Sequence, residues 1–189
     1  MRANTVALAR TADLLGIPVI TTASVPDGPN GPLMPEIHEV APKAQYVARN
    51  GEINAWDTPA FREAVAATGR RTLIMAAVIT SVCLAEPAIS AIGDGYTVYG
   101  VVDASGTYSK LSQELAVARM TTAGVVPIDT AATISELQRT WNRPEAPEFA
   151  STYASVMTNY QLLIESYQRA QAEATRADGA DAERKLANR

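Results

Sequence analysis

The strongest constraint on the fold is an uninterrupted apolar run, Leu-Ile-Met-Ala-Ala-Val, at residues 73–78. Because the run does not alternate with polar residues, it predicts a strand whose two faces are both covered by helices. Further strands are expected at residues 19–22, 46–49, 97–102 and 125–128. Helices are expected between them and before them, at residues 4–16, 58–69, 81–92 and 113–123. This alternation is typical of a three-layer α/β/α sandwich with a parallel sheet, whose sites lie at the carboxyl ends of the strands.

The length of 189 residues fits about one domain on the usual scale of ~150 residues per domain. We assign residues 1–170 to this domain and expect a disordered tail at 171–189, which is poor in large apolar residues. The domain includes an amphipathic helix at about 151–170, and its apolar stripe must be covered by the domain itself or by a neighbouring subunit. Pro127 places the last strand at a sheet edge, since proline has no N–H to donate. The Pro- and Gly-rich stretch 23–42 reads as a long functional loop.

Composition and charge exclude several function classes. The formal charge of −4 offers no basic face for nucleic acid. No apolar run approaches the roughly 18 residues of a membrane span, and the start lacks a signal-peptide core, so we expect a cytoplasmic protein. The single cysteine and single histidine argue against a disulfide, a structural zinc and any multi-thiolate metal site. Nucleotide-phosphate loops and a G-x-S-x-G turn are also lacking, so no metal and no cofactor is expected.

Cys83 is the candidate nucleophile. It follows the strongest strand, and Thr80 is a plausible N-cap for the helix that begins there. A thiol in the first turn of a helix is favoured as thiolate by the helix dipole, and the free N–H groups of that turn could hold an oxyanion. Pro87 cannot donate to the Cys83 carbonyl, so the turn is expected to be distorted. A lone cysteine that only packs in the core is the alternative interpretation.

Other polar residues gather at the same sheet edge. Arg49 ends its strand there and could stabilise a thiolate or a carboxylate substrate, although it cannot shuttle a proton. Asn54 and Trp56 follow and could line a pocket, while Trp56 fits a core position equally well. For Asp103 a turn-capping role is favoured over a catalytic one, and His38 reads as a surface residue rather than a ligand.

Taken together, these segments resemble the isochorismatase-like cysteine hydrolases, most closely the YcaC-type branch. The matching stretches occur in order along about residues 5–170 and read IPVITT at 17–22, GPNGP at 28–32, AR with INAWD at 48–57, VITSVC at 78–83 and VDASGT at 102–107. The resemblance implies an isochorismatase-like, Rossmann-like fold and an Asp, Lys, Cys triad, in which Cys83 is the nucleophile and Arg49 stands for the cation. It also implies a cis peptide between Ile79 and Thr80, with backbone N–H groups near Thr80 and Cys83 forming the oxyanion hole. A ring-like homo-oligomer, often an octamer, is implied as well.

One element of the family pattern has no counterpart here. The family's general-base Asp ends a first strand at the centre of the sheet, and no position of this sequence matches it. Without that strand the sheet has two unpaired edges. We expect an apolar strand followed by Asp about 10 to 20 residues before the first helix in the full gene. Two hypotheses follow: a hydrolase of a small-molecule amide or related C–N or ester bond, and a catalytically silent oligomeric scaffold or binding relative.

Overall fold

The computed structural model describes residues 1–176 and contains five parallel strands. The strands are β1 (Ile20–Ala23), β2 (Gln45–Ala48), β3 (Thr72–Met75), β4 (Thr97–Val101) and β5 (Val126–Ile128). All five predicted strands are therefore present, each within a few residues of its expected position. β5, which contains Pro127, pairs only with β4 and forms an edge, as its sequence predicts.

The strands form two sheets rather than one. β1 pairs with β2, and β3, β4 and β5 pair in that order. β1 and β3 do not pair, although Ile20 and Leu73 pack against the same core cluster. The parallel direction and the two unpaired edges agree with the sequence-based expectation. Ile74 of β3 and Val78 beyond it are consequently exposed.

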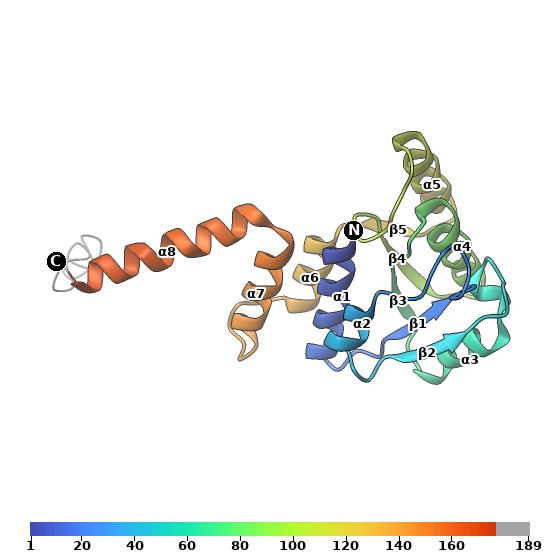
Figure 1. Cartoon of the computed structure of the whole chain (residues 1–189), viewed down its shortest axis with the longest axis horizontal. Helices are drawn as coiled ribbons and strands as arrows, with labels where there is room; N and C mark the ends of the chain where they lie inside the picture. The colour runs from blue at the N-terminus through green and yellow to red at the C-terminus, as the bar shows by residue number, and fades with distance from the viewer. Residues whose placement is uncertain (177–189) are drawn as a thin grey trace.

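Helices cover both faces of the strands (Figure 1). One layer consists of α3 (Pro59–Ala67), α4 (Ala85–Gly93) and α5 (Lys110–Thr122), and it packs on the strands through the main core cluster. The other layer consists of α1 (Arg2–Leu14), α2 (Pro35–Val40), α6 (Thr130–Gln138) and α7 (Ala146–Val156). This arrangement confirms the predicted three-layer α/β/α architecture.

Two helices differ from the sequence-based expectation. α2 interrupts the predicted long loop, and Pro35 at its start and Glu36 in its first turn are ordinary helix-start signals. The helix expected at 151–170 is divided in two, because Met157 adopts an extended conformation between α7 and α8 (Thr158–Arg176). Residues 171–176 of the expected tail are helical, and residues 177–189 lie outside the described part of the chain.

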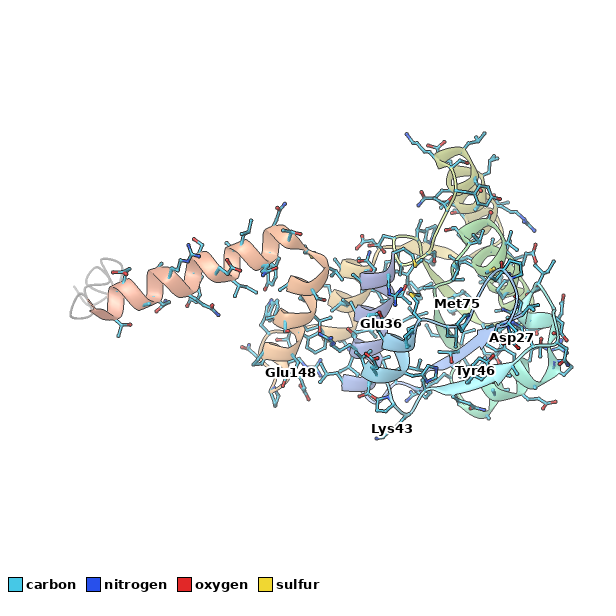
Figure 2. All side chains as sticks on the ribbon, in the orientation of Figure 1. Asp27, Glu36, Lys43, Tyr46, Met75 and Glu148 are labelled. Atoms are coloured by element: carbon cyan, nitrogen blue, oxygen red, sulfur yellow. The ribbon has the colours of Figure 1, made fainter. Side chains whose placement is uncertain are left out.

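The break at Met157 also divides the apolar stripe of this C-terminal region between α7 and α8. Tyr153 is buried against α1 and α6, and Val156 and Tyr160 pack on the same cluster. Beyond Tyr160, α8 runs away from the body (Figures 1 and 2). Leu162, Leu163 and Tyr167 are exposed there. The domain therefore covers the first half of the stripe and leaves the second half open.

Candidate active site

Cys83 lies in a π-helical turn, η2 (Thr80–Leu84), between β3 and α4. The amide of Leu84 donates to the Ile79 carbonyl oxygen over 3.1 Å, which is the five-residue spacing of a π-helix. This turn is the distortion that Pro87 predicts from the sequence. The thiol is free and partly exposed, so a ligand can reach it.

The peptide before Thr80 is trans, since none of the bonds in the described chain is cis. This differs from the expected cis peptide between Ile79 and Thr80. The reason lies in the loop after β4, where the Gly106 carbonyl oxygen accepts from both the backbone amide and the hydroxyl of Thr80, each over 2.7 Å. These bonds hold Ile79 in an extended conformation. They also engage the Thr80 amide, one of the two N–H groups expected to bind an oxyanion.

Gly106 makes this arrangement possible. A Cβ atom at this position would lie 2.1 Å from the Val78 carbonyl oxygen, far inside van der Waals contact. The Gly106 amide donates to the Ala77 carbonyl over 3.2 Å, so the loop continues the pairing of β3 beyond its end. The Ala77 amide in turn donates to the Ser105 hydroxyl over 3.1 Å. The path into the Cys83 turn is thus fixed by the glycine that follows β4.

Arg49 directly follows β2 and is held by three hydrogen bonds. Its Nε donates to Thr22 Oγ1 over 3.0 Å, and its Nη1 donates to the carbonyl oxygens of Glu52 and Ile53 over 2.7 and 2.9 Å. All three acceptors are neutral, so the positive charge of the guanidinium is not consumed by an ion pair in these contacts. Arg49 therefore stands fixed at the carboxyl end of the two-stranded sheet.

Cys83 and Arg49, which the sequence predicts at one edge, lie just beyond β3 and β2, and Cys83 is among the groups whose charge acts on the pKa of Arg49. Partial burial lowers the pKa of Arg49, and the negative charge that Cys83, Glu52 and Tyr46 can carry acts in the opposite direction. The thiol comes from the end of one sheet and the cation from the end of the other. The pair is therefore assembled across the line where the two sheets do not pair.

Asn54 and Trp56 tie the Arg49 loop to α4. Asn54 caps the short 3₁₀ helix η1 (Ala55–Asp57), and its side-chain amide donates to Ser90 Oγ over 3.1 Å. Trp56 is 4% exposed in the core, and its Nε1 donates to Asp94 Oδ2 over 2.7 Å. Of the two roles left open by the sequence for Trp56, the structure thus shows a buried core residue.

Asp103 and His38 serve the fold. Asp103 Oδ1 accepts from the amide and hydroxyl of Thr130 at the start of α6, over 2.8 and 2.7 Å. Asp103 thus serves the fold rather than catalysis, but it binds the start of α6, whose N-cap is Asp129, instead of capping its own turn as the sequence predicts. His38 lies half-buried in α2, with Nε2 3.0 Å from Thr21 Oγ1. Sequence analysis had placed it on the surface because it missed the helix.

Sequence analysis also missed a hydroxyl cluster beside the turn. Ser81 Oγ and Ser112 Oγ lie 3.2 Å apart, and hydrogen bonds from both lower the pKa of Tyr108. Serine and tyrosine carry no sequence signal for such a cluster, because the contacts depend on how α5 meets η2.

Within residues 1–176 no three His, Cys, Asp or Glu side chains lie close enough to hold a metal ion. None of the helices described there is long and apolar enough to cross a membrane.

Comparison with known proteins agrees with this fold. The sequence profile of the isochorismatase domain matches residues 1–132. This chain belongs to the isochorismatase family. It is 41% identical over 164 residues to the probable hydrolase YcaC of Escherichia coli, covering 87% of this chain and 78% of that protein.

Solved structures of the same branch are similar throughout the fold. YcaC from Pseudomonas aeruginosa, solved with hexane-2,5-diol and covalent acrylamide, has 43% identity and a TM-score of 0.83, over 88% of this chain and 82% of that one. The Escherichia coli YcaC structure, described as an octameric hydrolase of unknown specificity, has 41% identity and a TM-score of 0.84, over 89% and 82% of the two chains.

Proposed function

We propose that this chain is a hydrolase that cleaves a small-molecule amide, or a related C–N or ester bond, with the Cys83 thiolate as nucleophile. Membership of the isochorismatase family and the likeness to a probable hydrolase support hydrolysis. The observation that carries the thiol mechanism is the placement of a free, partly exposed Cys83 thiol in the turn after β3, with Arg49 held by hydrogen bonds at the end of β2. A cation beside a thiol stabilises the thiolate, which is the form that attacks a carbonyl.

The proposed reaction has two steps. The thiolate attacks the carbonyl carbon, a C–S bond forms, and the Cys83 amide in the η2 turn stabilises the oxyanion. The C–N bond then breaks, and the amine leaves with a proton from solvent. In the second step water attacks the thioester, which releases the carboxylic acid and returns the thiol. Arg49 stabilises the negative charge in both steps but accepts no proton.

The thiol proton needs an acceptor. No position of this sequence matches the general-base Asp of the family pattern, and Arg49 does not deprotonate in proteins. Arg49 can therefore not take up this proton, and the rate should rise with pH as the thiol loses it.

Reaction with acrylamide tests the nucleophile directly. Acrylamide is a small electrophile, and the Pseudomonas aeruginosa YcaC structure contains it in covalent form. We expect Cys83 to be alkylated at pH 7 faster than a free thiol of pKa about 8.5. Arg49→Gln should slow the reaction, and Cys83→Ala should give no adduct by mass spectrometry. Alkylation no faster than that of a free thiol, and insensitive to Arg49, would contradict the proposal.

Turnover separates this hydrolase from the scaffold hypothesis. A panel of small amides and esters is incubated with the wild-type chain and with Cys83→Ala. Release of acid that is lost in Cys83→Ala supports the hydrolase. If the chain releases no acid and its Cys83 is also unreactive, the hydrolase proposal fails. The catalytically silent scaffold, which is the second hypothesis drawn from the sequence, then remains.

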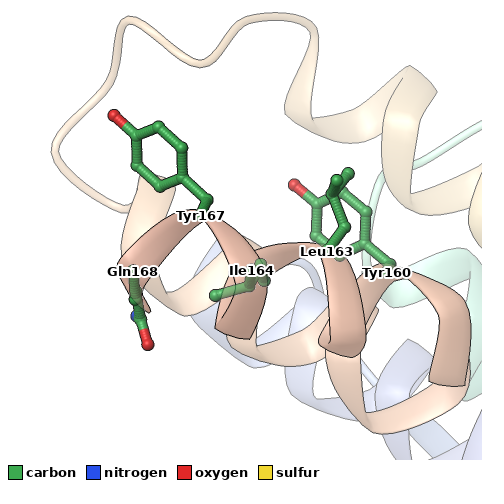
Figure 3. Close-up of a pocket in the computed structure, with 5 residues that line it drawn as sticks. All are labelled: Tyr160, Leu163, Ile164, Tyr167 and Gln168. Atoms are coloured by element: carbon green, nitrogen blue, oxygen red, sulfur yellow. The ribbon is translucent and has the colours of Figure 1, made fainter. Parts of the chain in front are cut away.

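We further propose that the chain acts as a homo-oligomer, with an octamer as the expected assembly. The Escherichia coli YcaC octamer, at 41% identity, supports this. The exposed part of α8 offers a surface for a second copy, where Leu163 and Tyr167 lie along the helix with Ile164 between them (Figure 3). Light scattering of the full chain tests it, and a monodisperse monomer would overturn it.

A further inference from the structure

Thr22 occupies a distinctive position in β1. Its Oγ1 accepts the Nε–H of Arg49 over 3.0 Å, and its side chain is half-buried. Thr21, the preceding residue, contacts His38 instead, with Oγ1 and Nε2 3.0 Å apart. Because successive side chains of a strand point to opposite faces, only Thr22 of this pair reaches the Arg49 side.

The bond from Thr22 complements those from the loop. The Glu52 and Ile53 carbonyls hold Nη1, and Thr22 holds Nε. A guanidinium is planar, so two fixed nitrogens determine the orientation of the whole group. Nη2 is the nitrogen of Arg49 that makes none of these bonds, and it remains for a thiolate or an oxyanion.

We infer that Thr22 is a positioning residue, which orients the Arg49 guanidinium toward Cys83 through the bond to Nε. The inference rests on the proposed function, because it assigns Thr22 a role in activating that thiol. Thr22 itself touches neither the thiol nor a substrate in this assignment. Its effect on Cys83 passes through Arg49.

The charged and titratable groups that act on Arg49 make the inference testable by pH. Arg49 interacts with Cys83, with Glu52 of the following loop and with Tyr46 of β2. Thr22→Val changes none of these groups and nearly keeps the shape and strand propensity of threonine. A change in the pH profile of Cys83 would thus come from the orientation of Arg49.

The experiment measures acrylamide alkylation of Cys83 in the full chain from pH 6 to 10. In Thr22→Val we expect the rate at pH 7 to fall about three- to tenfold, as for loss of one partly buried hydrogen bond. Thr22→Ser keeps the acceptor and should restore the rate to within about twofold. Thr21→Val is the matched control on the other face, and its profile should equal the wild type.

The outcomes distinguish the two proposals. If Arg49→Gln changes the profile but Thr22→Val does not, the role of Thr22 is overturned and the thiol mechanism stands. If neither variant changes a profile that already equals that of a free thiol, the proposed function fails. If Thr22→Val does not fold, a second measurement on the wild-type chain is used. It follows solvent exchange of the Arg49 Nε–H proton by NMR, and the signal is assigned by its loss in Arg49→Gln. Slow solvent exchange of that proton supports the bond, and exchange as fast as in a free arginine overturns it.

Discussion

The Asn54 side chain donates a hydrogen bond of 3.1 Å to Ser90 Oγ and so joins the loop that carries Arg49 to the helix that follows Cys83. A second tie runs from Trp56 Nε1 to Asp94 Oδ2 at the end of the same helix. Since β1 and β3 do not pair, backbone bonds do not set the distance between the two sheets. Side-chain ties of this kind fix the relative position of Arg49 and Cys83.

Removal of the second tie should destabilise the fold. Trp56→Phe keeps an aromatic ring in the core but loses the donor to a carboxylate oxygen, and we expect a cost of about 2 kcal/mol in the free energy of unfolding. Trp141, the other tryptophan, is 51% exposed. Trp141→Phe should therefore cost less than about 1 kcal/mol. Urea denaturation compares the two variants, and equal losses would contradict the role of the Trp56 tie.

Gly106 offers a second prediction, based on close approach. A Cβ there would meet the Val78 carbonyl oxygen at 2.1 Å. We expect Gly106→Ala to cost about 3 kcal/mol, because backbone on both sides must move. Gly93, at the end of α4, has open space around it. Gly93→Ala should be neutral or stabilising by about 0.5 kcal/mol. Thermal unfolding of both variants checks this, and a tolerated Gly106→Ala would rule out the tight approach.

Tyr153 should make the fold sensitive to alkali. Burial raises the pKa of Tyr153, Tyr160 acts in the same direction, and a hydrogen bond with Ser135 opposes them. A raised pKa in the folded state means that the stabilisation is complete below the unfolded value of about 10 and is lost as pH rises through the folded value.

The measurement is urea unfolding at several pH values between 9 and 11. Tyr153→Phe removes the ionisable group, so its stability should fall less steeply over this range than that of the wild type. Tyr167→Phe, at an exposed position of α8, is the control and should follow the wild-type curve. Parallel curves for Tyr153→Phe and wild type would argue against this source of alkali sensitivity.

Self-association through α8 can be tested at one exposed leucine. Leu163 is 62% exposed on α8, and Leu115 is 62% exposed on α5. A charge buried between two subunits is costly, so Leu163→Glu should shift the mass measured by light scattering to a smaller species. Leu115→Glu should keep the wild-type mass. An unchanged assembly in Leu163→Glu would exclude this face as the contact between copies.

Much of the fold follows from the sequence because uninterrupted apolar runs predict strands, although β3 is more exposed at Ile74 than its run predicts. The run at 73–78 predicts β3, and Pro87 predicts the distorted turn that holds Cys83. The break at Met157 has no such signal, since neither glycine nor proline stands there. It depends on how far the body can cover the apolar stripe, which is a tertiary property.

The candidate site, like the fold, can be predicted from the sequence only in part. The placement of Cys83 and Arg49 follows from the rule that parallel strands meet at their carboxyl ends. Side-chain partners do not follow from any rule of spacing. Nothing in the sequence pairs Asn54 with Ser90, or Thr22 with Arg49, because each contact joins separate elements. The trans peptide before Thr80 likewise depends on a carbonyl far along the chain, that of Gly106.

The missing pairing between the sheets should leave a signature in the exchange of amide hydrogens with heavy water. Parallel pairing uses every second residue of a strand. The Val19 carbonyl accepts from Gln45 and that of Arg71 accepts from Thr97, so the odd-numbered residues of β1 and β3 face their partners. The amides at the even positions, Ile20, Thr22, Thr72 and Ile74, point to the open edges. They should exchange rapidly in the middle of an otherwise protected domain, which makes the line between β1 and β3 the first part of this fold to open.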